Sequence, residues 1–268
     1  MKKELVESLV NEASVLTQRS DRQHYFEVNR KSILDFQAFF QRFPRLYQLL
    51  FKLLTPTVGI NNWPRFLQAE PEEVVLNLGC GTQQLDPDFI NIDFVGFPHV
   101  DVVADLEKPL PLKSGVADAA LCISVLEHLR NPDLLIEETA RVLKPGGRFY
   151  LSVPFVYPFH AAPSDYYRWT PEGLREKLSA HFDSVETGPR GGPWGDLVLT
   201  LAHINGQLLS FGNESIYRTL NHLTLALLFW VKYLDLLFCR LPFNRKMATS
   251  IYGFARKKSS VSNPSHTE

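Results

Sequence analysis

The sequence predicts an α/β fold in which a mostly parallel sheet is covered by helices. Three observations lead to this prediction. Short apolar runs alternate with helical segments between residues 74 and 187, which is the pattern of strand–helix–strand units. Two helix starts in this region carry a capping residue followed by proline. The first apolar run, Val74–Leu78, ends in a glycine turn, and open α/β sheets bind nucleotide-like molecules at such turns.

The first strand is expected over Val74–Leu78, because consecutive β-branched and aliphatic residues suit a parallel strand that is buried on both faces. Gly79 and Gly81 follow directly. Without a Cβ atom, these glycines allow a sharp turn and a close approach of the backbone to a ligand. The alternative is a structural turn that binds nothing.

The spacing after the glycine turn indicates which ligand fits. A dinucleotide site has a third glycine, a long helix and an acidic residue about 20 residues further on. Here the third glycine is absent, and Pro87 shortens the segment before the next strand, Phe89–Ile92. The acid that ends this strand, Asp93, comes too early for a dinucleotide site. A ligand with a ribose and an amino acid end but no phosphate fits better, with Asp93 accepting both ribose hydroxyls.

The remaining elements follow in order. A helix begins at Asn131, since asparagine caps free amides and the next residue is proline, and it is expected to end at Gly146. A second helix starts at Thr170 in the same way and runs to about Ala180. The expected strands after the second are 100–104, 117–123, 149–153 and 182–187.

Several of these motifs, taken in order, resemble the class I S-adenosylmethionine-dependent methyltransferases, in particular the type 11 methyltransferase domain. The resemblance covers about residues 74–187 and rests on NLGCGT, INIDF, VVADLEKPLPLKSGVADAALCISVLEHL and RVLKPGGRFYLSVP. It implies a Rossmann-like sheet of seven strands, mostly parallel, with an antiparallel last strand at 251–255. It also implies an enzyme that uses S-adenosyl-L-methionine.

The resemblance assigns most of the cofactor site. Asn77 stands where the family usually has an acid, so it can accept a hydrogen bond from the ligand's ammonium but brings no charge. Asp105 and Leu106 are expected to face the adenine, unless Asp105 caps a turn. Glu127 either binds the cofactor or caps the following segment. The expected cofactor-binding residues are Asn77, Gly79, Cys80, Gly81, Asp93, Phe94, Asp105, Leu106, Ser124 and Glu127.

Methyl transfer is an in-line displacement, so aligning donor and acceptor supplies much of the acceleration and no covalent nucleophile is needed. A base is needed only for a hydroxyl or a protonated amine. His128, just past the fourth strand, is the first candidate because its ordinary pKa lies near neutrality, although it can also serve structure alone. His160, in the loop after the fifth strand, is the second. His160 and Asp165 alone fall short of a metal site, so no metal is predicted.

The same loop, 154–170, is the expected substrate-binding segment. Aromatic side chains beside hydrogen-bonding groups suit a sugar ring or another flat polar acceptor, and Arg168 can hold a carboxylate or phosphate. The alternative is that the aromatic residues only pack the loop. The expected acceptor is a small molecule, a glycan or a lipid-linked molecule, and the expected substrate-binding residues are Tyr166, Tyr167, Arg168 and Trp169.

A strongly apolar insertion is expected between strands six and seven. The uncharged stretch 219–231 is shorter than the about 18 residues that a spanning helix needs. Its apolar side chains must still be covered, by the protein itself, by a second copy through 216–242 or by a membrane surface. The nearby basic residues that suit anionic headgroups are Arg218, Lys232, Arg240, Arg245 and Lys246. The chain is predicted to begin with a helical extension at 1–70, which either packs over the cofactor mouth or extends the core. The methyltransferase core follows at 71–194, then the insertion at 195–246, the final strand at 247–258 and a disordered tail at 259–268.

Composition bounds the remaining possibilities. The formal net charge of −1 implies no nucleic-acid partner. The three cysteines have no paired spacing and indicate reduced thiols, and the charged N-terminal segment lacks the apolar core of a signal peptide. A cytoplasmic protein, peripheral to a membrane if the insertion binds one, is expected. A binding or scaffold protein that keeps the fold without turnover is the alternative function, because Asn77 and the short segment after the glycine turn depart from the family.

Overall fold

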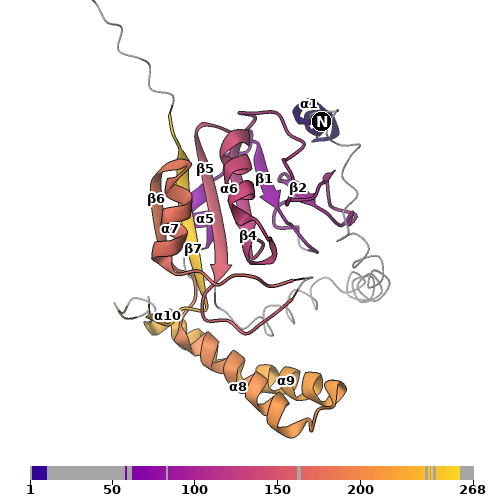
Figure 1. Ribbon diagram of the computed structural model, residues 1–268, viewed down its shortest axis with the longest axis vertical. Helices are drawn as coiled ribbons and strands as arrows, with labels where there is room; N and C mark the ends of the chain where they lie inside the picture. The colour runs from indigo at the N-terminus through magenta and orange to yellow at the C-terminus, as the bar shows by residue number, and fades with distance from the viewer. Residues whose placement is uncertain are drawn as a thin grey trace, which may run out of the picture.

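The computed structural model describes residues 2–10, 58, 62–82, 84–161, 164–238, 241, 243 and 246–259. Its sheet has seven strands in the order β3-β2-β1-β4-β5-β7-β6 (Figure 1). Neighbouring strands from β3 to β5 pair parallel, and β7 pairs antiparallel with both β5 and β6. The predicted Rossmann-like sheet with an antiparallel last strand is therefore confirmed. The strands are β1 Val75–Leu78, β2 Ile90–Asp93, β3 Val102–Val103, β4 Ala117–Ile123, β5 Leu143–Pro154, β6 Phe182–Pro189 and β7 Ser250–Lys257.

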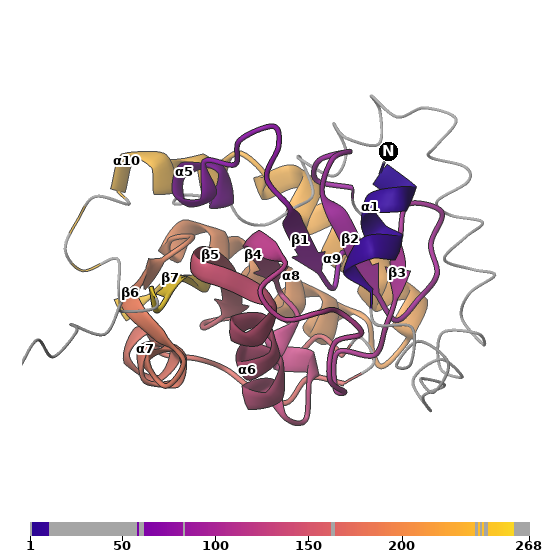
Figure 2. The same ribbon diagram turned by 90° about the horizontal axis from the view of Figure 1, so that it is seen from above.

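Helices cover both faces of the sheet. Figure 2 shows α6 and α7 on one side and α5 on the other. Alternate residues of one strand feed the two resulting cores: Phe149 of β5 packs with α6 and α7, whereas Tyr150 stacks on Phe66 of α5. The helices are α1 Lys2–Leu9, α5 Trp63–Leu67, α6 Pro132–Val142, α7 Pro171–Ser179, α8 Pro193–Leu209, α9 Glu214–Leu228 and α10 Leu234–Phe238, with short 3₁₀ turns η1 Leu126–His128 and η2 Val231–Tyr233.

Helix α6 begins after Asn131 as predicted, but its predicted end is wrong. Helix α6 ends at Val142, because Leu143 is already extended and pairs with Ala117 of β4. Gly146, expected to end that helix, instead has a φ of +77° within β5. The side chain of Asn131 makes no capping hydrogen bond to α6. In contrast, Thr170 caps α7 as predicted, since its hydroxyl accepts from the Gly173 amide at 3.1 Å.

The insertion lies beyond the edge of the sheet at which the parallel strands end (Figure 1). The insertion begins with α8 at Pro193. Helices α8 and α9 form an antiparallel pair, in which the Asn205 side-chain amide donates a hydrogen bond to the Thr224 hydroxyl. Among the described residues no single helix is long and apolar enough to cross a membrane, although α9 and the following helical segment 231–238, bent by 49°, pass that test together. Lys232 is only 2% exposed, so the expectation that it meets lipid headgroups is wrong.

Helix α1 holds the start of the chain against the sheet. Leu9 is buried in the larger core, its carbonyl accepts from the Lys113 amide, and Val10 forms a β-bridge with Leu112. Most of the helical extension expected at 1–70, including residues 11–57, lies outside the described residues, as does the tail from residue 260.

Candidate active site

A cavity of about 220 Å³ lies where β1, β2 and β4 end. Parallel strands of an open α/β sheet end at one edge, and ligands of such folds bind there. Much of its wall was anticipated from the sequence. The predicted site residues that line it are Gly79, Gly81, Asp93, Phe94, Asp105, Leu106, Ser124 and His128.

The glycine turn forms one side of the cavity. Gly79 and Gly81 have φ values of +69° and +55°, which favour glycine. A Cβ on Gly79 would lie 2.4 Å from a methyl carbon of Val125, whereas a Cβ on Gly81 would meet nothing within 4 Å. Gly79 is therefore required by close packing and Gly81 borders open space.

Asp93 joins the end of β2 to this turn. It is only 4% exposed, and its carboxylate accepts from the Gly81 amide at 2.8 Å and the Val95 amide at 2.9 Å. Burial raises the pKa of the Asp93 carboxyl, and the backbone N–H groups of Val95, Gly81 and Phe94 oppose that shift. These hydrogen bonds fix the carboxylate in the cavity wall, where each oxygen keeps lone-pair capacity for a ligand.

Asn77 and Cys80 are not among the residues that line the cavity. Asn77 is 2% exposed, and its amide donates to Asn91 of the neighbouring strand at 2.9 Å. Cys80 is buried, which raises the pKa of its thiol to about 12. The structure therefore places Asn77 in a polar contact between β1 and β2.

The adenine-side candidates follow the strand ends. Asp105 and Leu106 come shortly after β3, and the Asp105 carboxylate accepts from the Glu107 amide at 3.0 Å. This bond is the turn cap that was the predicted alternative to adenine contact for Asp105. Asp105 also lines the cavity. Ser124, directly after β4, has a φ of +54° and donates its amide to the Ser152 carbonyl.

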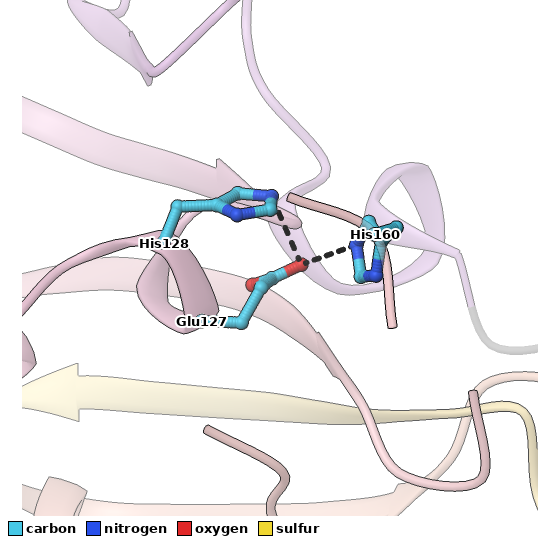
Figure 3. Close-up of side chains that lie close together, drawn as sticks. All are labelled: Glu127, His128 and His160. Atoms are coloured by element: carbon cyan, nitrogen blue, oxygen red, sulfur yellow. Dashed lines mark ion pairs between the residues drawn. The ribbon is translucent and has the colours of Figure 1, made fainter. Parts of the chain in front are cut away.

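Both histidine candidates face Glu127 (Figure 3). The Nε2 atoms of His128 and His160 lie 3.9 Å and 3.7 Å from Glu127 Oε1. Burial lowers the pKa of His160, but the Glu127 and Asp165 carboxylates and the Pro158 carbonyl outweigh it, so that pKa is raised. Of these three, only His128 lines the cavity.

The four substrate candidates make contacts that hold their own loop. The Arg168 guanidinium binds both oxygens of Asp165, at 2.5 and 2.7 Å, and hydrogen bonding to Arg168 lowers the Asp165 pKa to about 2. Tyr166 and Tyr167 bond Arg130 through their hydroxyls, and Trp169 is buried. None of the four lines the cavity described above. Trp169 packs in the core, whereas Tyr166 and Tyr167 are 42% and 39% exposed.

A second cavity, of about 560 Å³, was not anticipated. Its wall is mainly apolar and comes from the insertion together with Val156, which follows β5. Asp196 is the acidic residue in this wall. The apolar run of the insertion was the available signal, but the sequence does not say which of its side chains surround a hollow. The lining includes Trp194, Leu197, Phe238, Phe243 and Met247.

The sheet order, the glycine turn and the acid after β2 define a Rossmann-like core with a ligand site at its edge. Residues 58–151 match the model of the family Methyltransf_11, described as a methyltransferase domain. This match confirms the predicted resemblance to the methyltransferase domain for that segment of the chain. The cofactor of the domain family is S-adenosylmethionine.

Curated relatives match short stretches. A ubiquinone biosynthesis O-methyltransferase of Dechloromonas aromatica (strain RCB) is 37% identical over 68 residues, covering 24% of this chain and 28% of that protein. One from Xanthomonas oryzae pv. oryzae (strain PXO99A) is 45% identical over 50 residues, covering 19% and 21%. An uncharacterized 37.1 kDa protein of a Streptomyces fradiae transposon is 32% identical over 110 residues, covering 33% and 32%. The chain thus matches about a third or less of the length of these relatives.

Among solved structures, a Haemonchus contortus phosphoethanolamine N-methyltransferase 2 in complex with S-adenosyl-L-methionine superposes with a TM-score of 0.47 at 16% identity, covering 84% of this chain and 60% of that one. A Burkholderia thailandensis 1,6-didemethyltoxoflavin-N1-methyltransferase gives a TM-score of 0.45 at 16% identity, covering 91% and 93%.

Proposed function

We propose that the chain is an S-adenosylmethionine-dependent methyltransferase that acts on a small acceptor with an apolar portion. The observation that carries the proposal is the meeting of Asp93, Gly79 and Gly81 at the wall of one cavity within the segment that matches the domain family. Two features support the proposal: the Asp93 carboxylate is fixed at the end of β2, and Gly79 and Gly81 bring no Cβ atoms to the turn.

The residues around this cavity fit the cofactor. Asp93 has lone pairs for two ribose hydroxyls, and the backbone at Gly81 borders space that a Cβ would enter without a clash. Leu106 offers apolar contact to the adenine and Asp105 a carboxylate to its amino group. When bound, S-adenosylmethionine supplies a methyl group on a positively charged sulfur.

The histidines beside the cavity support a role in proton removal. A carbonyl oxygen only accepts hydrogen bonds, so His128 Nδ1, 2.5 Å from the Ser164 carbonyl, carries a proton. In the neutral imidazole, Nε2 is then the proton-accepting atom. His128 lines the cavity, and we assign the removal of the acceptor's proton to the cluster that it forms with Glu127 and His160.

The second cavity supports an apolar or lipid-linked acceptor over a glycan. Its wall contains Trp194, Phe238 and Phe243, and these side chains match an apolar tail better than hydroxyl groups. Val156 connects the cavity to the loop that carries His160. Tyr166, Tyr167, Arg168 and Trp169 act in this proposal by holding that loop in shape.

The insertion exposes apolar residues, and we infer that a second copy of the chain packs against them rather than a membrane. Leu227 is 72% exposed and Trp230 is 56% exposed. Of the basic residues named for headgroup contact, Lys232 is buried and Arg218 is paired with Glu214 at 2.7 Å, which leaves Lys246 exposed among those that the structure describes. Homodimerisation through 216–242 is therefore part of the proposal.

Calorimetry with S-adenosylmethionine and S-adenosylhomocysteine tests the cofactor assignment. Both are expected to bind one site per chain, and no binding of either would remove the enzyme from consideration. Transfer of a labelled methyl group to apolar phenols, amines or lipid-linked acceptors tests turnover. Binding without transfer to any acceptor class would favour the scaffold alternative.

A further inference from the structure

The cluster of Glu127, His128 and His160 joins two segments that are distant in the sequence. Glu127 and His128 belong to η1, after β4, and His160 belongs to the loop after β5 (Figure 3). One ligand atom from each of the three lies within 4.8 Å of the others. Two ligands bound about 2.1 Å from one ion lie roughly 3 to 4 Å apart, and the measured Nε2–Oε1 separations of 3.7 and 3.9 Å fall in that range.

The orientation of both imidazoles suits metal binding. His128 Nδ1 lies 2.5 Å from the Ser164 carbonyl, and His160 Nδ1 lies 3.2 Å from the Pro158 carbonyl and 3.4 Å from an Asp165 oxygen. Since all three partners are acceptors, each Nδ1 carries a proton. In the neutral form of each ring, Nε2 is therefore the nitrogen that can bind a metal, and it lies 3.9 Å (His128) or 3.7 Å (His160) from Glu127 Oε1. Metal-binding histidines are commonly oriented by such contacts at the other ring nitrogen.

Glu127 provides an independent observation. The residue is 0% exposed, and both of its carboxylate oxygens are buried without a hydrogen-bond partner among the described residues. A buried carboxylate that lacks hydrogen bonds is costly unless a cation compensates it. Without a metal, a proton on His160 Nε2 balances part of this charge, in line with the raised pKa of His160. A divalent cation bound by both Nε2 atoms and by Glu127 would take the place of that proton.

We propose that Glu127, His128 and His160 bind a divalent metal ion of the Zn²⁺ type. Imidazole nitrogens suit zinc and neighbouring transition metals, whereas Mg²⁺ and Ca²⁺ prefer oxygen ligands. Two histidines and one glutamate leave a coordination position for water or an acceptor atom, as in catalytic zinc sites. This proposal replaces the sequence-based expectation of no metal, which considered only His160 and Asp165.

The use of this ion in methyl transfer rests on the proposed function. His128 lines the cofactor cavity, so the ion would lie at its wall. An acceptor hydroxyl bound to such an ion would lose its proton to solvent water more readily, because a bound Zn²⁺ lowers the pKa of a coordinated O–H group. With Nε2 of both histidines bound to the ion, this route would replace direct proton removal by the histidines. Metal binding itself does not depend on this role.

The test uses the full chain, stripped with a chelator and titrated with Co²⁺, whose visible absorption reports its ligands. We expect one Co²⁺ per chain, displaced by Zn²⁺ and not by Mg²⁺. Glu127→Gln and His160→Gln are each expected to weaken Co²⁺ binding at least tenfold. His222→Gln on α9, whose side chain is exposed, is the control and should leave the affinity unchanged.

Cofactor calorimetry on the same samples separates the two proposals. Retained S-adenosylmethionine binding with lost Co²⁺ absorption would show that the variants fold and that the metal site is specific. His160, whose side chain is 33% exposed, is the safer variant if Glu127→Gln does not fold. A wild-type chain without the Co²⁺ absorption, or an affinity unchanged by His160→Gln, would overturn the metal site whether or not the cofactor binds.

Discussion

The Asp93 carboxylate accepts a hydrogen bond from the Gly81 amide at 2.8 Å, which ties the end of β2 to the turn after β1. The same turn is held from the other side, because the Gly79 amide donates to the Ile92 carbonyl at 2.8 Å. Hydrogen bonds therefore connect two adjacent parallel strands and one turn into one wall of the cavity. A ligand that bonds Asp93 meets a carboxylate that is already oriented.

Replacing Asp93 with asparagine should weaken S-adenosylmethionine binding by about 10- to 100-fold. The amide loses the charge that strengthens hydrogen bonds to the ribose, and such bonds contribute about 1.5–3 kcal/mol each. Calorimetric dissociation constants check this. Asp183→Asn, at an exposed position of β6, is the matched control. An unchanged dissociation constant in Asp93→Asn would contradict the ribose assignment.

The two glycines of the turn should differ in their response to alanine. Gly81→Ala should cost about 1–2 kcal/mol from backbone conformation alone, since its Cβ would meet nothing within 4 Å. Gly79→Ala adds the clash with Val125 and should cost about 1–3 kcal/mol more. Urea unfolding of the single variants measures both costs.

The double variant Gly79→Ala with Val125→Ala isolates the clash. Removing the Val125 methyl carbons should recover part of the stability that Gly79→Ala loses, in a double-mutant cycle. Strictly additive losses would mean that the backbone conformation, and not the contact, makes Gly79 necessary.

The predicted site residues that line the cavity are those whose position follows from one strand end. Asp93 ends one apolar run and Gly81 lies in the turn after another, so the parallel sheet brings them to one edge. Asn77 could not be placed in this way, because its partner Asn91 is set by the register of β1 with β2. Its polarity within a buried strand was the only available signal.

The other differences between the predicted and the observed structure depend on tertiary contacts. His160 reaches Glu127 only because the loop after β5 folds back over η1, and no spacing in the sequence encodes that approach. The Arg168–Asp165 pair lies three residues apart and was visible in the sequence, but its choice of an internal partner over a ligand was not. Leu143 ends α6 early because pairing with β4 outweighs helix propagation.

The stability of the chain should fall as pH rises from about 4 to 8 because of Asp196. This residue is 3% exposed, and burial, assisted by the Asp235 carboxylate, raises the pKa of its carboxyl to about 8. The folded state then keeps a proton that the unfolded state releases near its ordinary pKa of about 3.9. Deprotonation therefore favours unfolding across that window, and the loss levels off above the folded-state pKa.

Asp196→Asn should remove this dependence, which is on the order of a few kcal/mol between pH 5 and pH 8. Urea unfolding at several pH values measures it, with Asp183→Asn on the exposed face of β6 as the control. The same pH slope in wild type and Asp196→Asn would mean that the carboxyl titrates normally.

Self-association should depend on the apolar residues that the insertion exposes. Leu227 and Trp230 stand at and just beyond the end of α9 and are mostly exposed in the single chain. A second copy that covers them removes apolar area from water, which contributes about 25 cal/mol per Å². Sedimentation velocity should therefore show a concentration-dependent dimer for the wild type.

The variant Leu227→Asp with Trp230→Asp should sediment as a monomer, because burying two carboxylates in the interface is unfavourable. Leu5→Asp, on the exposed side of α1, adds a charge elsewhere and should leave the dimer intact. Cofactor affinity should stay the same in the double variant, since neither residue lines the cavity of Asp93. If the wild type is a monomer that co-sediments with anionic vesicles, and the double variant does not co-sediment, the surface would bind a membrane and not a second copy.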